Sequence, residues 1–446
     1  MMEKIRSNLI LKKIFKHLEK CLFYNLIRHN KKYQAKFGLT LNEYKHYNEI
    51  IIELIPIRNF IDKKIFINIK EKNNFNIYFD DEEVKRNYIT ENDSVSKIKV
   101  ILNPKNKSLK ELFDFCDCLK EINFIQFNRR DIIDMSDMFY NCKELISIKF
   151  SNFKTKNVVN MANMFACCMS LKELDLSNFN TSNVINMENM FYDCKSLEYL
   201  DISHFNTIKV TNMFCMFSQC SSLKKLNISN FNTFNVTNMM DMFNDCFFLE
   251  ELDISNFDTS KINNMFNMFN NCASLKELNI LNFNTNKVTN MSYLFQGCES
   301  LKELNLSNFN TSKVTNMSFM FQGCSSLKSL NLSNFDTTRV NNMSKMFKGC
   351  SSLTELNLLK FNTGNVTNMD FMFEDCSSIK ELDLSNFKTG KVINMDNMFC
   401  NCLSLINLDI SGFNINKYTN TYNMFLNCKD EIQSKILSKI LNNNKG

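Results

Sequence analysis

Cysteine is the residue type in this chain with the greatest capacity for chemistry, and thirteen of the 18 cysteines recur with a period of 26 residues. Zinc requires CxxC pairs or Cys and His sets at ligand spacing, whereas Cys116 with Cys118 and Cys167 with Cys168 are spaced differently. Identical thiols in register offer disulfides no unique pairing. Free cysteine usually packs in protein cores as a small hydrophobic residue. A metal site and disulfide bonds are the two alternatives. We therefore predict a column of buried thiols, with no metal and no cofactor, at Cys116, Cys142, Cys168, Cys194, Cys220, Cys246, Cys272, Cys298, Cys324, Cys350, Cys376, Cys402 and Cys428.

Groups suited to catalysis are sparse. The chain has no phosphate-binding GxxxxGK[ST] or GxGxxG motif, and only His204 of its four histidines lies within the repeats. Aspartate and asparagine share one repeat position, and a catalytic carboxylate would not be exchanged with an amide. We predict that the chain is not an enzyme and has no small-molecule substrate. The shared position holds Asp175, Asp201, Asp253, Asp383 and Asp409, and also Asn227, Asn279, Asn305, Asn331 and Asn357.

The repeat itself predicts the fold, because a strict period of 26 residues means that every coil has the same length. SLKSLNLS alternates apolar and polar residues, as at Leu330, Asn331 and Leu332, which is typical of a half-buried strand. Strands one coil apart run parallel, since the rest of each coil supplies the crossover. NMSFMFQGC places Met317 and its apolar successors at helical spacing, and Asn316 stands where a helix cap belongs. The recurring methionines and phenylalanines are interpreted as core.

These elements predict an α/β solenoid of about 12 coils of 26 residues, with a short parallel strand and a short helix in each coil. We expect residues 1–55 to form a small helical region, 56–93 a linker or hairpin, 94–428 the solenoid, and 429–446 a C-terminal capping helix and tail. The apolar residues of DEIQSKILSKIL lie at helical spacing, so this helix packs on the last coil or, alternatively, on a membrane surface.

The segment LKELDLSNFNTSNVINMENMFYDC (residues 171–194) and the corresponding segments of the other repeats resemble the BspA-like leucine-rich repeats, specifically the repeat of 26 residues found in mycoplasma-like lipoproteins. This resemblance spans about residues 108–428. It implies a leucine-rich-repeat solenoid with a binding or adhesion role, which includes cell-surface or host interaction. Near the N-terminus, ILKKIFKHL (residues 10–18) weakly resembles the opening helix of F-box domains, which implies a ubiquitin-ligase substrate adaptor. A plain helical cap is the other interpretation of that segment.

The side chains that flank the strand leucines form the best candidate binding surface, because they point away from the core and change from coil to coil. Tyr199 is the one aromatic residue among them, and aromatic residues are enriched at binding hot spots. A merely solvated face with Lys–Glu pairs is the alternative. The predicted partner-binding residues are Lys172, Glu173, Asp175, Glu198, Tyr199, Asp201, Lys224, Lys225, Glu251 and Asp253.

A second exposed column is basic and precedes the repeated valine. It could meet an acidic partner or nucleic acid, but no aromatic residues are interleaved with it. The column contains Lys209, Lys261, Lys287, Lys313, Arg339, Lys391 and Lys417.

The sequence shows no recognisable secretory leader and no apolar run long enough to span a membrane. These observations predict a cytoplasmic location, with the cell surface as the alternative. We also expect the chain to be a monomer. We expect a non-catalytic scaffold that binds a protein partner on the sheet face of the solenoid. The mild net charge of +6 does not by itself indicate a partner.

Overall fold

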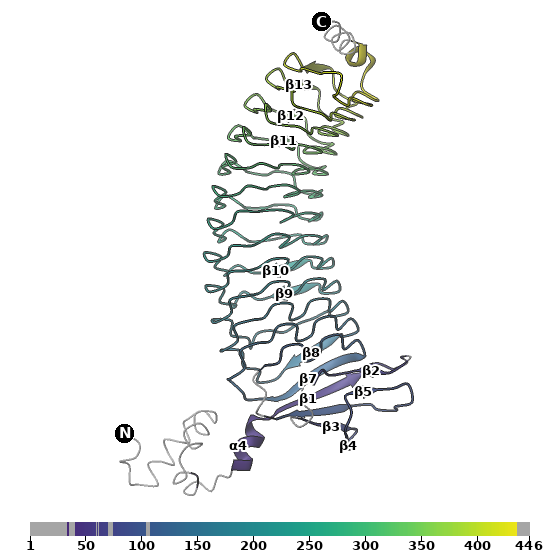
Figure 1. Ribbon diagram of the computed structural model, residues 1–446, viewed down its shortest axis with the longest axis vertical. Coiled ribbons are helices and arrows are strands. Elements are labelled where there is room, and N and C mark those ends of the chain that lie inside the picture. The colour runs from purple at the N-terminus through teal and green to yellow at the C-terminus, as the bar shows by residue number, and fades with distance from the viewer. Residues whose placement is uncertain are drawn as a thin grey trace, which may run out of the picture.

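The computed structural model describes residues 41–434 and residue 34, except for residues 59, 61, 70–74 and 104–107. Figure 1 shows an elongated, curved stack of coils, with a broader sheet at its N-terminal end. Eleven parallel bridges join residues of one repeat position in successive coils, from Ser108–Asp134 to Asn394–Asn420. The predicted solenoid is therefore confirmed.

A six-stranded sheet closes the N-terminal end of the stack, in the order β4-β3-β6-β1-β7-β8 (Figure 1). Only β7 and β8 pair in parallel, so this sheet converts antiparallel pairing into the parallel pairing of the coils. Residues 56–93, predicted to be a linker or hairpin, contain the β3–β4 pair. The elements are α4 (Leu41–Asn48), β1 (Ile50–Pro56), β2 (Lys64–Ile65), β3 (Phe75–Phe79), β4 (Glu82–Val84), β5 (Tyr88–Ile89), β6 (Ile98–Leu102), β7 (Leu119–Phe127) and β8 (Ser147–Phe150).

The N-terminal helical region was predicted over residues 1–55, and most of it lies outside the described residues. Within it the structure places helix α4, and then strand β1, which begins at Ile50 and crosses the predicted boundary. Strand β1 pairs with β6 on one side and β7 on the other, and its alternate residues are buried because they point to the same face of the sheet. The F-box-like segment falls among the residues that are not described, so it remains a prediction.

The later strands are short and pair in parallel at a separation of one coil. Leu200 of β9 faces Leu226 of β10, and both are buried, while their neighbours Tyr199 and Asp201 are exposed. This alternation is what the sequence predicts for a half-buried strand. These strands are β9 (Tyr199–Asp201), β10 (Lys225–Asn227), β11 (Ser329–Leu330), β12 (Glu355–Leu356), β13 (Glu381–Asp383) and β14 (Asn407–Asp409).

The predicted short helix in each coil is wrong, because the segment is a series of turns. In the NMSFMFQGC segment, the Met320 N–H donates to Met317 O at 3.3 Å, but the Phe319 N–H donates to Ser344 O of the next coil at 2.9 Å. Phe319 and Gly323 have φ angles of 61° and 70°, in the left-handed region that a right-handed helix excludes. Alternate N–H groups therefore bond within the turn and between coils.

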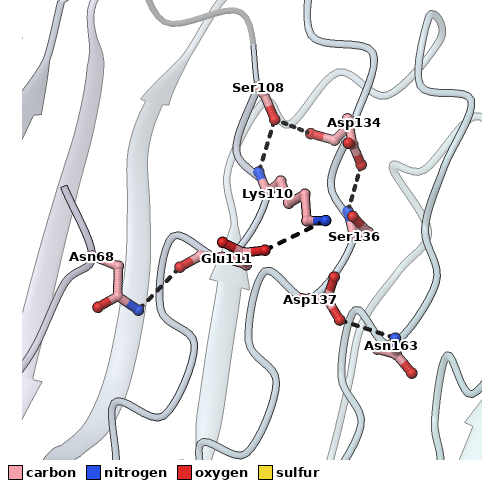
Figure 2. Close-up of polar contacts among 8 residues, drawn as sticks. All are labelled: Asn68, Ser108, Lys110, Glu111, Asp134, Ser136, Asp137 and Asn163. Carbon is pink, nitrogen blue, oxygen red and sulfur yellow. Dashed lines mark hydrogen bonds and ion pairs between the residues drawn. The ribbon is translucent and has the colours of Figure 1, made fainter. Parts of the chain in front are cut away.

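Two repeat positions adopt positive φ throughout the stack, and their composition explains how. They run from Glu111 to Asn423 and from Phe115 to Asn427. Seven of thirteen residues in the first and ten of thirteen in the second are Asn, Asp or Gly, the residue types that enter this region most readily. Figure 2 shows how one such column is linked, with Asn163 Nδ2 donating to Asp137 Oδ1 at 2.9 Å.

The asparagines at the repeat position of Asn316 make the hydrogen bond typical of a helix N-cap, although no helix follows them. The Ser318 N–H donates to Asn316 Oδ1 at 3.0 Å, which is an Asx turn. In Figure 2, Asp134 accepts the Ser136 N–H at 3.0 Å in the same way. The interchange of Asn and Asp in this column thus reflects side-chain capping of a turn, where helix capping was predicted.

Substitutions at Gly323 test the left-handed geometry. Gly323→Asn should change the free energy of unfolding by less than about 1 kcal/mol, since a Cβ here would meet only Gly297 backbone atoms at 3.6 Å. Gly323→Val should lower it by about 1–2 kcal/mol, because a β-branched residue is strained at positive φ. Urea unfolding followed by circular dichroism measures both. Equal stability of the two variants would contradict the assignment.

The core is built from columns of identical side chains. Phe321 stacks on Phe295 and Phe347 with ring centroids 5.9 and 5.8 Å apart, and all three rings are fully buried. A column of buried threonines joins each coil to the next. Thr285 Oγ1 donates to Asn310 O at 2.9 Å and accepts the Asn310 N–H at 2.7 Å.

The start of the C-terminal capping helix predicted within residues 429–446 is present in the structure. Residues 430–434 are helical, and Ile432 is buried against the last coil. The rest of the predicted capping helix lies outside the described residues.

Candidate functional site

All ten predicted partner-binding residues are exposed, and three of them, Tyr199, Asp201 and Lys225, lie in strands β9 and β10. Side chains at alternate positions of a strand point to the same side, and the parallel register aligns the coils. Lys225 lies beside Tyr199 and Asn227 beside Asp201, while Lys225 also pairs with Glu251 of the following coil. The exposed residues are Lys172, Glu173, Asp175, Glu198, Tyr199, Asp201, Lys224, Lys225, Glu251 and Asp253.

A shallow cleft of about 710 Å³ gathers six of these ten residues on two successive coils. Tyr199 is 55% exposed there, so its ring presents a large apolar surface to solvent. The lining includes Lys172, Glu173, Asp175, Glu198, Tyr199, Asp201 and His204. The other four predicted residues, Lys224, Lys225, Glu251 and Asp253, do not line this cleft but lie on the next two coils.

His204 was missed by the sequence prediction. Its Nε2 lies 3.0 Å from Leu176 O, and its ring meets Phe205 edge-on at a centroid distance of 5.1 Å. The signal was present in the sequence, because His204 interrupts a run of asparagines at this repeat position, between Asn178 and Asn230.

The carboxylates of this face are held in their ionised form. Asp175 and Asp201 each accept the N–H of the serine two residues later, at 2.9 and 3.0 Å, and these hydrogen bonds lower the pKa of both carboxyl groups. The hydrogen bond from Lys224 Nζ, at 2.8 Å, lowers the pKa of Glu198 in turn. The face therefore presents fixed negative charges beside Lys172 and Lys225.

A second cleft on the same face lies farther along the stack. Lys276, Glu277, Lys302 and Glu303 line it, together with Leu281, which is 42% exposed. No aromatic side chain is among the residues that line it. The first cleft, with Tyr199 and His204, is consequently the more distinctive of the two.

The cysteine column is buried, as predicted. Each thiol from Cys142 to Cys428 lies near the main-chain oxygen of a phenylalanine in the preceding coil, as Cys324 Sγ does with Phe295 O at 3.1 Å. Burial raises the pKa of Cys298 and Cys350 to about 12, so these thiols are protonated at neutral pH. The reactive form of cysteine, both as a nucleophile and as a metal ligand, is the deprotonated thiolate. Across the described ranges, no group of three or more His, Cys, Asp or Glu side chains could hold a metal ion.

The repeat region matches a protein family described as "Mycoplasma protein of unknown function, DUF285", in overlapping segments over residues 107–200, 169–252, 198–278, 247–330, 274–357 and 323–438. The chain belongs to this family. The relationship to BspA-like leucine-rich repeats expected from the sequence is thereby confirmed. No curated protein matches this DUF285 chain.

Three solved structures are similar to this DUF285 protein. A leucine-rich repeat protein from Bacteroides ovatus is 20% identical over 79% of this chain and 88% of its own, with a TM-score of 0.41. A leucine rich cell surface protein from Faecalibacterium prausnitzii is 17% identical over 66% and 77%, with a TM-score of 0.29. A leucine-rich repeat protein from Eubacterium ventriosum is 14% identical over 66% and 83%, with a TM-score of 0.34.

Within the part of the chain that the structure describes, no helix combines the length and the apolar character needed to cross a membrane.

Proposed function

We propose that this DUF285 protein is a non-catalytic scaffold that binds a protein partner on the sheet face, centred on the cleft at Tyr199. The observation that carries this proposal is the contrast between core and face. The core columns repeat the same residue types, whereas the exposed strand positions change from coil to coil. Tyr199 takes the place of the Glu or Lys found at this position in the adjacent coils, Glu173 and Lys225.

The chemistry of the cleft suits a polypeptide surface with both apolar and basic groups. Tyr199 offers an aromatic contact with a polar tip, the kind of group that dominates binding energy at interfaces. Asp175, Asp201 and Glu173 place carboxylates around it, while Lys172 supplies one compensating positive charge. Charged groups at the rim of an interface set specificity and association rate more than affinity.

A triple variant tests this proposal. The partner is first isolated with the wild-type chain. Glu173→Ala, Tyr199→Ala and Asp201→Ala together should weaken its binding by at least about 30-fold, as expected for loss of one hot spot of about 2 kcal/mol. The affinity is measured by calorimetry with the purified partner. All three side chains are exposed, so the stability of the fold should change little.

The matched control removes residues from the same strand positions of later coils. Glu355, Glu381 and Asp383 are also exposed, and their replacement by alanine removes three carboxylates, one more than the first triple removes. These replacements should leave the affinity within about threefold of wild type. The proposal fails if the control triple weakens the partner as much as the first triple, or if the first triple leaves every partner bound.

A further inference from the structure

A second surface of the solenoid concentrates its positive charge. In each of twelve coils, six residues follow the strand and its turn, and they begin at residues 128, 154, 180, 206, 232, 258, 284, 310, 336, 362, 388 and 414. We name this surface the basic edge. It contains twelve Lys or Arg and three Asp residues, a net charge of +9, whereas the whole chain carries +6. The remainder of the chain is therefore net negative.

The cations in the central coils of the basic edge face solvent, whereas Arg129 in the first coil is buried and paired with Asp131. Lys287, Lys313 and Arg339 are exposed on three successive coils and follow the half-exposed Lys261. Coils are spaced by about 4.8 Å, less than the Debye length of about 8 Å at physiological salt, so their potentials add. Where a lysine of this column has a close partner, that partner is an amide, as for Lys209 Nζ and Asn183 Oδ1 at 2.6 Å. Among the described residues, none of these five cations forms an ion pair.

Large apolar side chains share this edge. Ile208 and Phe234 occupy the same position in adjacent coils and are 49% and 53% exposed, and Lys261 Nζ lies 4.3 Å from the centre of the Phe234 ring. At a neighbouring position Ile133, Val159 and Ile185 stack on successive coils, each exposed. The edge therefore combines a net positive charge with exposed apolar surface.

The main chain of the edge is already paired. The Ile185 N–H donates to Val159 O at 2.9 Å, the Thr211 N–H to Ile185 O at 2.9 Å, and the Thr315 N–H to Thr289 O at 2.8 Å. An extended peptide that adds to a sheet relies on free main-chain groups at the edge, and this column has none to offer at these residues. A nucleic acid strand would need several stacking aromatics, whereas the twelve segments of the edge contain two aromatic side chains, Phe234 and Tyr418, which lie seven coils apart.

We infer that the basic edge binds an anionic lipid surface peripherally, with the cations facing the headgroups and Ile208 and Phe234 entering the interface. A lipid surface uses both features at once, since basic residues near it gain from its negative potential and apolar residues gain from leaving water. It requires no main-chain pairing. The sheet face lies at other positions of each coil and stays available to a protein partner.

Vesicle binding by the full-length chain tests this inference. Vesicles of phosphatidylcholine with about a third phosphatidylserine should sediment the protein, whereas pure phosphatidylcholine should not. Lys287→Asn, Lys313→Asn and Arg339→Asn together should weaken binding about 100-fold, at about fivefold for each cation. Asparagine occupies the same position at Asn235 and Asn365, so the fold accommodates it.

The control removes equal charge from the same region of the stack. Lys276→Asn, Lys302→Asn and Lys328→Asn lie on the sheet face and should weaken vesicle binding by less than about threefold. Equal losses in the two triples would show that only net charge matters and would overturn the inference. Absence of binding to the anionic vesicles would overturn it as well.

The apolar residues separate a lipid surface from an acidic polymer. Ile208→Ser and Phe234→Ser introduce a residue found at this position in Ser182 and Ser260, and the double variant should lose at least about tenfold in vesicle binding. If that variant binds vesicles as the wild type does, and polyglutamate displaces the protein from them, the ligand is a soluble polyanion and the lipid assignment is wrong.

Discussion

Replacing Thr285 by valine should lower the free energy of unfolding by about 2–4 kcal/mol, because two main-chain groups lose their partner at once. The Thr285 hydroxyl donates to Asn310 O at 2.9 Å and accepts the Asn310 N–H at 2.7 Å. Valine has nearly the same shape but can do neither. Thr285 is 1% exposed, so water cannot easily replace the hydroxyl. The large effect comes from the unpaired amide and carbonyl, since the volume of the side chain is almost unchanged.

Thr289→Val is the matched control within the same coil. The Thr289 side chain is exposed, and its hydroxyl makes one hydrogen bond, to Asn263 O at 3.2 Å. We expect a loss below about 1 kcal/mol there. Urea titration gives both values, and hydrogen exchange of the Asn310 amide reports the first site directly. If both variants lose the same stability, or if the Asn310 amide keeps its protection in Thr285→Val, the hydroxyl does not join the coils.

The coil and its inward-facing columns could be predicted from the sequence because the interactions repeat at one spacing. Leu330 and Leu332 alternate with Asn331, and burial follows that alternation. The cysteine column was placed in the core for a similar reason. A small apolar group that recurs at one position in every coil is best explained by packing in the core.

The predicted helices were wrong because the apolar spacing alone does not separate a helix from a pair of turns. Met317, Met320, Phe321 and Cys324 are buried in both arrangements. The residues between them decide, since Phe319 and Gly323 occupy columns rich in Asn, Asp and Gly. Those residue types tolerate positive φ, and a right-handed helix requires φ to be negative throughout.

The N-terminal sheet escaped prediction for a different reason. Strand β1 pairs with β6 and β7, and Ile52 lies opposite Val100 and Phe124. The residues in contact are far apart in the sequence, and each contact occurs only once, so no repeating pattern in the sequence predicts them. The candidate site was predictable in part: alternation exposes Glu173, Tyr199 and Asp201, but the inclusion of His204 in the cleft depends on how two coils meet.

Raising the pH should unfold this protein abruptly between about pH 9 and 11, because the buried thiols resist ionisation. Burial raises the pKa of Cys220, Cys298 and Cys350 to about 12 from an ordinary value of 9.0. Between those values the unfolded chain releases protons that the folded chain keeps. The stability due to these thiols is thus complete below pH 9 and declines as the pH rises toward the folded pKa.

The slope for one thiol in that window is about 1.4 kcal/mol per pH unit. Three of them together contribute about 4 kcal/mol per pH unit, a large effect against typical stabilities of about 5–15 kcal/mol. Burial also raises the pKa of Cys324. The triple variant Cys298→Ala, Cys324→Ala and Cys350→Ala should therefore be less stable than wild type at pH 7, yet lose stability more slowly above pH 9. Urea titrations in oxygen-free reducing buffer measure the free energy of unfolding at each pH.

Comparison of the two slopes isolates the thiols, because lysine and tyrosine titrate in both proteins. A second triple, Ser325→Ala, Ser326→Ala and Ser351→Ala, changes neighbouring hydroxyl groups that do not ionise in this range and should keep the wild-type slope. Parallel curves for the wild type and the cysteine triple would mean that folded and unfolded thiols ionise alike. The column would then be open to solvent and to thiolate chemistry, which the burial of every recurring cysteine argues against.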